Sequence, residues 1–319
     1  MKKPKILVTG IVSRDGLTDL FAQYDVSYAE QAYTREWVLE HIKEYDGLLL
    51  MGMKADRELI DRAEKLQVIS VNGVGFDHVD VRYAAEKGIV VSNSPQSVRV
   101  PTAEMTFALL LAAAKRLYFY DSVVRSGEWM DVSKQEYQGM TLAGNILGIF
   151  GMGRIGKTVA AYARCFGMKV IYNDLYRLPK EQEIEAGIQY VEFDQLLEQS
   201  DIVSIHAPLV DSTRHAFDKA AFAKMKQTAC IINAARGAII EEAALVNALE
   251  NKEIAGAGLD VFEFEPQVSE KLRALPNVIL SPHAGTGTVG GRREIAKEAA
   301  ANLLAYFSGK PVHVVCVDG

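Results

Sequence analysis

Four apolar runs in the second half of the chain end in polar or charged side chains. The runs are "DIVSIHAP", "ACIINAARG", "GAGLDVFEFEP" and "NVILSPHAG", and the side chains at their ends are His206, Arg236, Asp260, Glu263, Glu265 and His283. Such runs are typical of buried parallel strands, whose carboxyl ends share one edge of a sheet where ligands bind. The sequence therefore predicts that an arginine, one or two carboxylates and a histidine lie together at that edge.

These residue types suit one kind of reaction. Reduction of a ketone by a nicotinamide requires a proton donor for the developing alkoxide, and an imidazole can supply that proton near neutral pH. A neighbouring carboxylate would orient and stabilise the charged ring. The planar guanidinium of Arg236 can hold a substrate carboxylate with two hydrogen bonds. Taken singly, each residue has a plainer explanation, such as a solvated loop arginine or a carboxylate that caps a turn.

The stretch "ILGIFGMGRIGKTVA" predicts a dinucleotide site. Its pattern Gly151-x-Gly153-x-x-Gly156 follows an apolar strand and begins a helix, which is the context that distinguishes the motif from an ordinary glycine-rich turn. The amides of Arg154 and Ile155 would then favour a pyrophosphate at the helix N-terminus. The next strand, "KVIYND", ends at Asp174, whose carboxylate can accept the ribose hydroxyls and would repel a 2′-phosphate. We therefore expect NAD(H) rather than NADP(H), although Arg177 nearby keeps the alternative open.

The elements that must position these residues alternate along the whole chain. The first series of apolar runs is "KILVTG", "DGLLLMG", "LQVISVNG" and "IVVSN", and the second is "ILGIFG", "KVIYND", "DIVSIHA", "ACIINAA", "IAGAGLDV" and "VILS". Strand-length runs separated by helix-length segments predict an α/β fold. We expect two Rossmann-like or flavodoxin-like parallel-sheet domains with a cleft between them. Residues 1–100 and 289–319 would form a discontinuous substrate-binding domain, and residues 101–288 the dinucleotide-binding domain.

Three further segments connect the predicted domains. Pro101 suits the first turn of a helix that is apolar on almost every side from Met105 to Leu117, so we expect that helix to be buried between two domains or two subunits. A long amphipathic helix begins near residue 288 and ends at Gly309. The final "VHVVCV" is predicted to return to the first domain as a strand or extended tail.

Composition limits the possible partners. The 319 residues include 49% apolar and 24% charged side chains, as in ordinary globular proteins, and the net charge of −6 disfavours nucleic acid. No segment has the length of a membrane span, and no cluster has the spacing of a metal site. The three cysteines, Cys165, Cys230 and Cys316, are far apart and are expected to be small buried side chains in a reducing compartment, which predicts a cytoplasmic protein.

On the motifs "GIFGMGRIGKTVA", "HAPLVDST", "INAARGAIIEEAAL", "GLDVFEFEP" and "SPHAG", the sequence resembles the D-isomer-specific 2-hydroxyacid dehydrogenase family over nearly its whole length. The resemblance implies a catalytic triad of Arg236, Glu265 and His283, with NAD as cofactor, a small 2-hydroxy or 2-keto acid as substrate, and a homodimer formed through the coenzyme domain. Besides the residues of the glycine motif and Asp174, the implied cofactor contacts are Thr102, His206, Pro208, Ala234, Ala235, Arg236, Asp260 and His283. In "VNGVGFDHVD", the backbone amides of Val74 and Gly75 would hold the substrate carboxylate.

Departures from the patterns of individual branches narrow the substrate. Gly52-Met53 stands where the phosphoglycerate branch usually has Arg-Ser, Val74 where the phosphite branch has lysine, and Glu265 where formate dehydrogenases usually have glutamine. Met51 and Met53 are expected to line the side-chain pocket. The pairs D-lactate/pyruvate, glycerate/hydroxypyruvate and glycolate/glyoxylate stay open, as do larger 2-keto acids. The alternatives are a phosphoglycerate dehydrogenase and an NADH-sensing scaffold of the same fold that binds other proteins.

Overall fold

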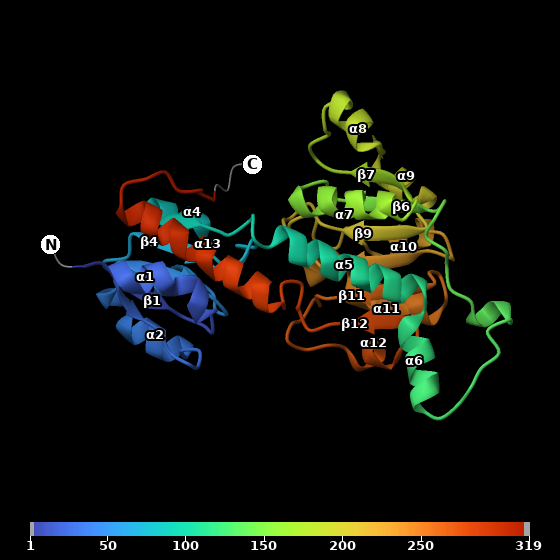
Figure 1. Ribbon diagram of the computed structural model, residues 1–319, viewed down its shortest axis with the longest axis horizontal. Coiled ribbons are helices and arrows are strands. Elements are labelled where there is room, and N and C mark those ends of the chain that lie inside the picture. Colours follow the sequence, from blue (N-terminus) through green and yellow to red (C-terminus); the bar gives the residue numbers. More distant parts are fainter. Residues whose placement is uncertain (1–2, 316–319) are drawn as a thin grey trace. The chain divides into compact units, whose positions relative to one another are not determined.

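The computed structural model describes residues 3–315 and divides into two compact α/β units (Figure 1). Unit 1 comprises the chain up to Pro101 and from Thr286 onward, and unit 2 comprises Thr102–Gly285. Each unit is built on a sheet whose strands all run parallel. The predicted pair of parallel-sheet α/β domains is confirmed.

The sheet of unit 1 has five strands in the order β2-β1-β3-β4-β5, the order of flavodoxin-like folds. They are β1 (Lys5–Val8), β2 (Asp25–Ser27), β3 (Gly47–Leu50), β4 (Val68–Val71) and β5 (Val90–Ser92). Because successive side chains of a strand point to opposite faces, Ile6 and Val8 pack on one side of the sheet and Leu7 on the other. Both faces are therefore buried, which is why these strands read as continuous apolar runs.

Helices cover the two faces of this sheet. One face packs against η1 (Arg14–Leu17), α1 (Thr18–Gln23) and α13 (Val289–Phe307). The other packs against α2 (Arg35–His41), η2 (Ile42–Glu44), α3 (Arg57–Arg62) and α4 (Val81–Glu86). The predicted C-terminal helix is confirmed, and it ends where Gly309 takes a positive φ of 71°. The tail beyond it forms no strand up to residue 315, but the Val315 amide donates to Val91 O at 2.9 Å and its side chain is buried; Cys316 and the residues after it lie outside the described chain.

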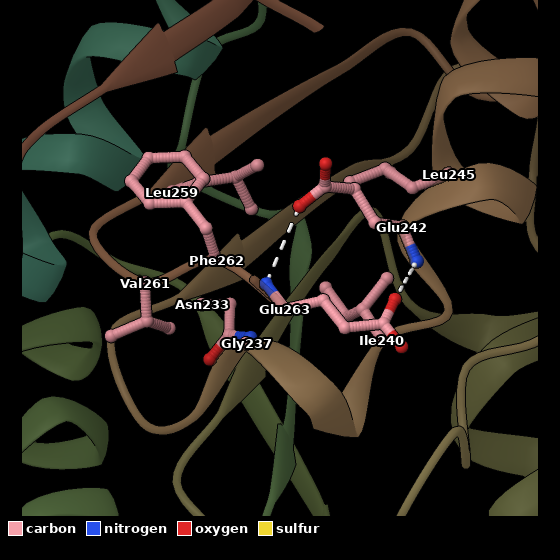
Figure 2. A pocket seen from close by; sticks show the side chains of 9 residues that line it. All are labelled: Asn233, Gly237, Ile240, Glu242, Leu245, Leu259, Val261, Phe262 and Glu263. Atoms are coloured by element: carbon pink, nitrogen blue, oxygen red, sulfur yellow. Dashed lines mark hydrogen bonds between the residues drawn. The ribbon is translucent and has the colours of Figure 1, made fainter. Parts of the chain in front are cut away.

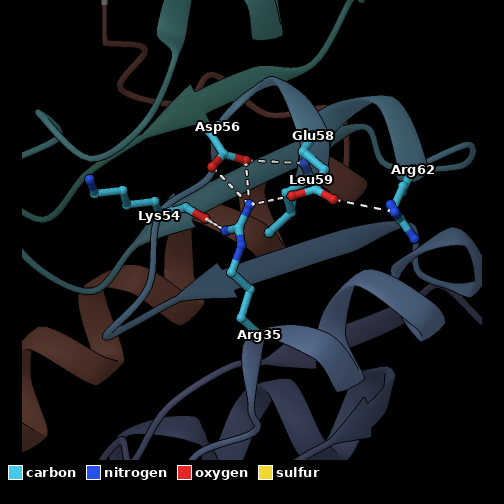
Figure 3. Close-up of polar contacts among 6 residues, drawn as sticks. All are labelled: Arg35, Lys54, Asp56, Glu58, Leu59 and Arg62. Atoms are coloured by element: carbon cyan, nitrogen blue, oxygen red, sulfur yellow. Dashed lines mark hydrogen bonds and ion pairs between the residues drawn. The ribbon is translucent and has the colours of Figure 1, made fainter.

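Arg35 at the start of α2 fixes the segment that follows β3. Its guanidinium donates to the Lys54 carbonyl at 3.1 Å and to the two carboxylate oxygens of Asp56 at 2.7 and 2.8 Å, and it also reaches Glu58 at 3.2 Å. Figure 3 shows these groups converging on the one side chain. Asp56 in turn caps α3 by accepting the Leu59 amide. This network therefore braces the stretch that begins with Met51 and Met53.

The sheet of unit 2 has seven strands in the order β12-β11-β10-β9-β6-β7-β8, which is the doubly wound arrangement. They are β6 (Ile146–Phe150), β7 (Lys169–Asn173), β8 (Ile188–Tyr190), β9 (Ile202–Ile205), β10 (Cys230–Asn233), β11 (Gly256–Leu259) and β12 (Val278–Leu280). The direction of winding reverses between β6 and β9. Dinucleotides bind at such a switch point, outside the carboxyl ends of the strands.

Helices again cover both faces of the sheet. The core on one side contains residues of α5 (Arg99–Ala114) and α7 (Arg154–Cys165), and the core on the other contains residues of α9 (Phe193–Gln199), α10 (Lys219–Lys224) and α11 (Glu242–Glu250). The remaining elements of the unit are α6 (Leu117–Arg125), η3 (Gln135–Tyr137), α8 (Lys180–Ala186), η4 (Gly237–Ile239) and α12 (Glu270–Ala274). None of the described helices is long and apolar enough to span a membrane.

Two sequence predictions are wrong. The helix expected to be buried from Met105 to Leu117 ends at Ala114, since Arg116 takes a left-handed φ of 53° and begins a new helix, α6, that has no buried residue. Leu117 is 58% exposed. Cys165, expected to be buried, is exposed at the end of α7, whereas Cys230 is buried in β10 as expected. Both cysteines are free thiols.

A glycine at the contact between η1 and α13 provides a test of how unit 1 is assembled. A Cβ on Gly16 would lie 2.5 Å from Arg293 O and 2.6 Å from Ala296 Cβ, so α13 can approach η1 only over a glycine. We predict that Gly16→Ala lowers the free energy of unfolding by about 1–3 kcal/mol, as overpacking of a close contact does. Gly290→Ala, near the start of α13, is the control, because a Cβ there meets no atom within 4 Å. Urea unfolding of both variants checks this; equal stability would mean that the helix is not seated on Gly16.

Candidate active site

The loop after β6 is shaped by two glycines that cannot be replaced without a clash. Gly151 has a φ of 97°, and a Cβ on it would lie 2.4 Å from the Ala207 amide nitrogen. A Cβ on Gly156 would lie 2.3 Å from Gly151 O. The first glycine therefore lets the loop turn against the end of β9, and the third lets α7 pack tightly on the loop, as a dinucleotide-binding motif requires.

Gly153 differs from these two because a Cβ on it would meet nothing within 4 Å. It is the N-cap residue of α7, so no side chain of its own covers the first amides of that helix, which belong to Arg154 and Ile155. Open space beside helix-terminal amides favours an anion that comes close to the backbone. These residues fit the pyrophosphate of a dinucleotide.

Asp174 directly follows β7, as the sequence predicted. One of its carboxylate oxygens accepts the Met152 amide of the glycine loop at 2.6 Å, and the other accepts the Tyr176 amide at 2.9 Å. The side chain is half-buried. The carboxylate is thus held beside the glycine loop, at the position where the ribose of a dinucleotide is recognised in this fold.

Other predicted cofactor residues lie at the ends of neighbouring elements. His206 follows β9, and its ring nitrogen Nε2 lies 2.8 Å from Ser204 Oγ. Burial lowers the pKa of His206 to about 3, although part of the side chain is accessible, so we take the ring to be neutral at pH 7. Pro208 is exposed two residues later. Thr102 is buried near the start of α5, close to Gly285.

Arg236 lies on a turn that Asn233 organises. The buried Asn233 side chain accepts the Ala235 amide at 3.0 Å and donates to the Arg236 carbonyl at 2.9 Å. These two bonds close the turn that contains Ala234 and Ala235. The guanidinium of Arg236 donates to its neighbour's carbonyl, Ala235 O, at 2.7 Å and is half-buried. Asn233 was not predicted, and its place at the last position of a buried strand is the signal that could have identified it.

A second turn carries Glu265 and touches the first at Gly237. A Cβ on Gly237 would lie 1.9 Å from Phe262 C and 2.0 Å from Phe262 O, so the two backbones meet here without any side chain between them. Glu265 Oε1 accepts the Phe262 amide at 2.9 Å, which folds the second turn back on itself. The arginine turn and the glutamate turn are therefore positioned by one direct contact.

Glu265 and His283 form a hydrogen-bonded pair. His283 Nδ1 lies 2.8 Å from Glu265 Oε2, and the imidazole is half exposed. Burial alone would raise the pKa of Glu265, but the hydrogen bonds from His283 and the Phe262 amide and the charges of His283 and Arg236 hold that pKa below its ordinary value. The carboxylate is thus ionised at neutral pH, and the other edge of the ring is open.

Asp260 fixes the loop on which His283 lies. Its carboxylate is fully buried and accepts Ser281 Oγ at 2.5 Å, the Ala284 amide at 2.7 Å and the Gly285 amide at 2.7 Å. The Asp260 carbonyl also accepts the His283 amide at 2.7 Å. His283 has a left-handed φ of 52°, an unfavourable conformation for a residue with a side chain, so the loop keeps it only because these bonds require it.

Glu263 belongs to a different cluster. Figure 2 shows Glu242 and Glu263 facing each other across a small pocket: the Glu242 amide donates to Glu263 Oε2 at 2.9 Å, and the Glu263 amide donates to Glu242 Oε2 at 3.3 Å. Glu263 Oε1 also pairs with His215 Nε2 at 2.7 Å. Burial raises the pKa of Glu242. Of the carboxylates that follow β11, Glu265 is therefore the one paired with His283, while Glu263 anchors the turn.

The predicted substrate residues of unit 1 lie at the carboxyl ends of its strands. Val74 and Gly75 follow β4, and the Val74 carbonyl accepts a hydrogen bond from Asn93 Nδ2 at 2.7 Å. Met51 follows β3 and packs toward the α13 side of the sheet, whereas Met53 packs toward the α2 side. Asn93 and Asn72 each have a buried side-chain oxygen without a protein partner. The roles of these residues in substrate binding stay predictions.

Within the described chain, no cluster of His, Cys, Asp and Glu side chains has the grouping of a metal site. NAD(H), when bound, supplies or accepts a hydride. The turn of Arg236 contacts the turn of Glu265 at Gly237, Glu265 is hydrogen-bonded to His283, and the glycine loop is hydrogen-bonded to Asp174.

A doubly wound sheet with this glycine loop and with a histidine hydrogen-bonded to a glutamate defines an NAD-dependent oxidoreductase. The sequence profile described as "D-isomer specific 2-hydroxyacid dehydrogenase, NAD binding domain" matches residues 107–285. The chain is 41% identical to a glyoxylate reductase of Thermococcus litoralis over 99% of this chain and 98% of that one. It belongs to the D-isomer-specific 2-hydroxyacid dehydrogenase family.

Solved structures agree with this assignment. A glyoxylate reductase from Paecilomyes thermophila superposes with a TM-score of 0.89 at 36% identity, covering 99% of each chain. An NADPH-dependent glyoxylate/hydroxypyruvate reductase from Sinorhizobium meliloti, in complex with NADP and malonate, has a TM-score of 0.86 at 31% identity, covering 99% of this chain and 97% of that one. The sequence-based family assignment is confirmed, and the chain is an NAD-dependent enzyme that acts on the CH–OH group of 2-hydroxy acids.

The role of Asp260 can be tested by Asp260→Asn. The asparagine side chain has the same shape, but its NH₂ group replaces an oxygen that accepts hydrogen bonds from the loop after β12. We predict a loss of about 1–3 kcal/mol in the free energy of unfolding, because a buried donor is left unsatisfied, and a fall in kcat larger than any change in NADH affinity. Asp201→Asn is the control, since Asp201 accepts the Ile146 amide at 2.8 Å in the same unit but far along the chain from the His283 loop. It should lower stability and keep kcat. Equal kcat in the two variants would contradict the proposed clamp.

Proposed function

We propose that this enzyme uses NADH to reduce small 2-keto acids, such as glyoxylate, hydroxypyruvate or pyruvate, to the D-2-hydroxy acids, and that it runs the reverse reaction with NAD. The observation that carries the proposal is the 2.8 Å pair between His283 and Glu265 beside the Arg236 turn. The similarity to glyoxylate reductases supports small substrates of this type. Gly52-Met53, in place of the Arg-Ser of the phosphoglycerate branch, favours substrates without a phosphate.

The three side chains divide the chemistry between them. Arg236 holds the substrate's carboxylate and polarises its carbonyl oxygen through a planar pair of donors. His283 donates a proton from Nε2 to that oxygen during reduction, because Nδ1 is occupied by Glu265. Glu265 keeps the ring oriented and favours its protonated form. Each proton transfer therefore occurs at one ring nitrogen while the other stays bonded.

We assign the remaining contacts on the same basis. The substrate is held in addition by the amides of Val74 and Gly75 and enclosed by Met51 and Met53. The cofactor contacts come from the glycine loop, Asp174 and residues at the neighbouring strand and helix ends. The cofactor residues are Gly151, Gly153, Arg154, Ile155, Gly156, Thr102, His206, Pro208, Ala234, Ala235, Arg236, Asp260 and His283. The two free thiols Cys165 and Cys230 suit a reducing compartment, so we place the enzyme in the cytoplasm.

We also propose that the enzyme is a homodimer formed through unit 2. Apolar side chains are exposed on α6 and on the segment after it, with Trp129 90%, Val124 59% and Val132 56% exposed. A group of exposed apolar side chains this large on one segment is typical of a protein interface, and a second copy of the chain is its simplest partner. Sedimentation of the parent and of Trp129→Ser tests this. The parent should have the mass of two chains at micromolar concentration, and a monomeric parent would contradict the proposal.

The activity itself is tested by NADH oxidation with a panel of glyoxylate, hydroxypyruvate, pyruvate, a larger 2-keto acid and 3-phosphohydroxypyruvate. We predict turnover of the small unphosphorylated acids. Arg236→Gln and Arg236→Lys should lower kcat/KM at least about 30-fold, since truncating one partner of a buried charge pair costs about 2 kcal/mol or more. His283→Gln should remove most turnover while NADH still binds. NADH binding without turnover of any acid would instead favour the scaffold alternative.

The pairing of Glu265 with His283 predicts a shift in pH dependence. Reduction needs the imidazolium, so kcat/KM for reduction falls as pH rises, whereas oxidation needs the neutral ring and gains. The pKa of Glu265 is held below its ordinary value, so Glu265 is a carboxylate throughout this range and its negative charge favours a protonated ring beside it. In Glu265→Gln the charge is gone, and the alkaline fall in reduction should begin at lower pH. Glu263→Gln removes the carboxylate beside His215 instead, so the pH at which reduction falls should stay as in the parent. A shift of equal size in both variants would disprove the pairing.

A further inference from the structure

The segment after β7 contains a cation, Arg177, that is held in an ion pair with Glu183. Arg177 lies three residues beyond Asp174. Its Nε donates to Glu183 Oε1 at 2.9 Å and its Nη2 donates to Glu183 Oε2 at 3.1 Å. The guanidinium also lies over the ring of Tyr190, 5.0 Å from the centroid. Two-pronged bonding and stacking on one side chain hold it toward α8 and β8.

Glu183 is itself held firmly. Only 8% of its side chain is exposed, and it accepts a third hydrogen bond from Tyr172 Oη at 2.9 Å. Tyr172 is fully buried, and burial raises the pKa of its phenol to about 12, so the phenol stays a donor at all working pH values. Tyr172 Oη also accepts the Leu178 amide at 2.9 Å. The anchor on which Arg177 is held is thus part of the core and not a mobile surface carboxylate.

The chemistry at the end of β7 gives this ion pair a consequence. Asp174 places a negative charge where the ribose of the cofactor is recognised, and a 2′-phosphate there would need a cation to offset the repulsion. Within residues 174–178 Arg177 is the only cation. A structurally similar relative is NADPH-dependent, so the fold accommodates either cofactor. Whether Arg177 is free to turn toward the ribose then affects which cofactor binds.

We propose that Glu183 is a determinant of cofactor choice: by retaining Arg177 in its ion pair, it withholds the cation that the 2′-phosphate of NADP(H) would require. Asp174 repels the phosphate, and Glu183 prevents the compensating contact. The inference rests on the proposed placement of the ribose at Asp174 and does not depend on which 2-keto acid is reduced.

The test is the dissociation constant of NADH and of NADPH, measured by titration calorimetry without substrate. In an Asp174→Asn background, which removes the repulsion, Glu183→Gln should tighten NADPH about tenfold, the contribution of about one charge-assisted hydrogen bond. NADH affinity should change less than about twofold by the same step. Adding Arg177→Gln should abolish the gain. An unchanged NADPH affinity in Asp174→Asn/Glu183→Gln, or a gain that survives the loss of Arg177, would overturn the proposal.

Two further variants keep the test decisive. Tyr172→Phe removes a hydrogen bond to Glu183 but leaves the ion pair, so NADPH affinity should not rise; an equal rise would mean that loosening of the segment, and not release of Arg177, is responsible. As a single substitution, Arg177→Gln should leave the affinity for NADPH unchanged, because Glu183 already keeps this cation from the phosphate. Weaker NADPH binding in this variant would mean that Arg177 contacts the phosphate even while Glu183 is intact, and it would contradict the proposal. If Asp174→Asn leaves the affinities for both cofactors unchanged, the ribose placement itself fails, which is distinguishable from failure of the Glu183 proposal.

Discussion

The buried carboxylate of Asp260 is the interaction on which the candidate active site depends. It follows β11 and accepts three hydrogen bonds from the loop after β12, while its own carbonyl accepts the His283 amide. A fully buried polar group is tolerated only when its hydrogen bonds are satisfied, so the loop has little freedom to adopt another conformation. The left-handed backbone of His283 is the visible result, because that conformation aims the imidazole at Glu265 while leaving its other edge open.

The neighbouring turns are also held by backbone contacts and buried polar groups. Gly237 lets the backbone of the Arg236 turn touch the backbone of Phe262, and the reciprocal bonds of Glu242 and Glu263 hold that second turn from behind. Reactive side chains on separate strands are thus linked through main-chain contacts and buried polar groups, not through their own flexible ends. Such support is what allows a half-exposed histidine to keep one orientation. On the cofactor side, Asp174 is joined to the glycine loop by the Met152 amide in a comparable way.

Much of this could be predicted from the sequence because parallel strands buried on both faces read as uninterrupted apolar runs. The strands that the sequence did not indicate are β2 and β8, three-residue strands at sheet edges that are too short and too polar for that signal. The break before α6 was missed since Arg116 lies in a stretch that favours helix and adopts its left-handed conformation without a glycine. Residue patterns alone left open whether Glu263 or Glu265 pairs with His283, because the two carboxylates follow the same strand two residues apart. The family resemblance implied Glu265, and the folded positions show that Glu265 pairs with His283 and Glu263 with His215. That Arg177 is paired with Glu183 is shown only by the fold.

The most direct test of the account is nuclear magnetic resonance of the chain labelled with ¹⁵N-histidine, which observes the His283 ring itself. The hydrogen bond between His283 Nδ1 and Glu265 should give a downfield Nδ1–H signal in the parent. His215 Nε2, bonded to Glu263, provides an internal reference for a correctly folded unit. The account predicts that the His283 signal is lost in Glu265→Gln and lost or broadened in Asp260→Asn while the His215 signal persists in both. A His283 signal that is unchanged in Asp260→Asn would contradict the claim that the buried carboxylate holds the imidazole in place.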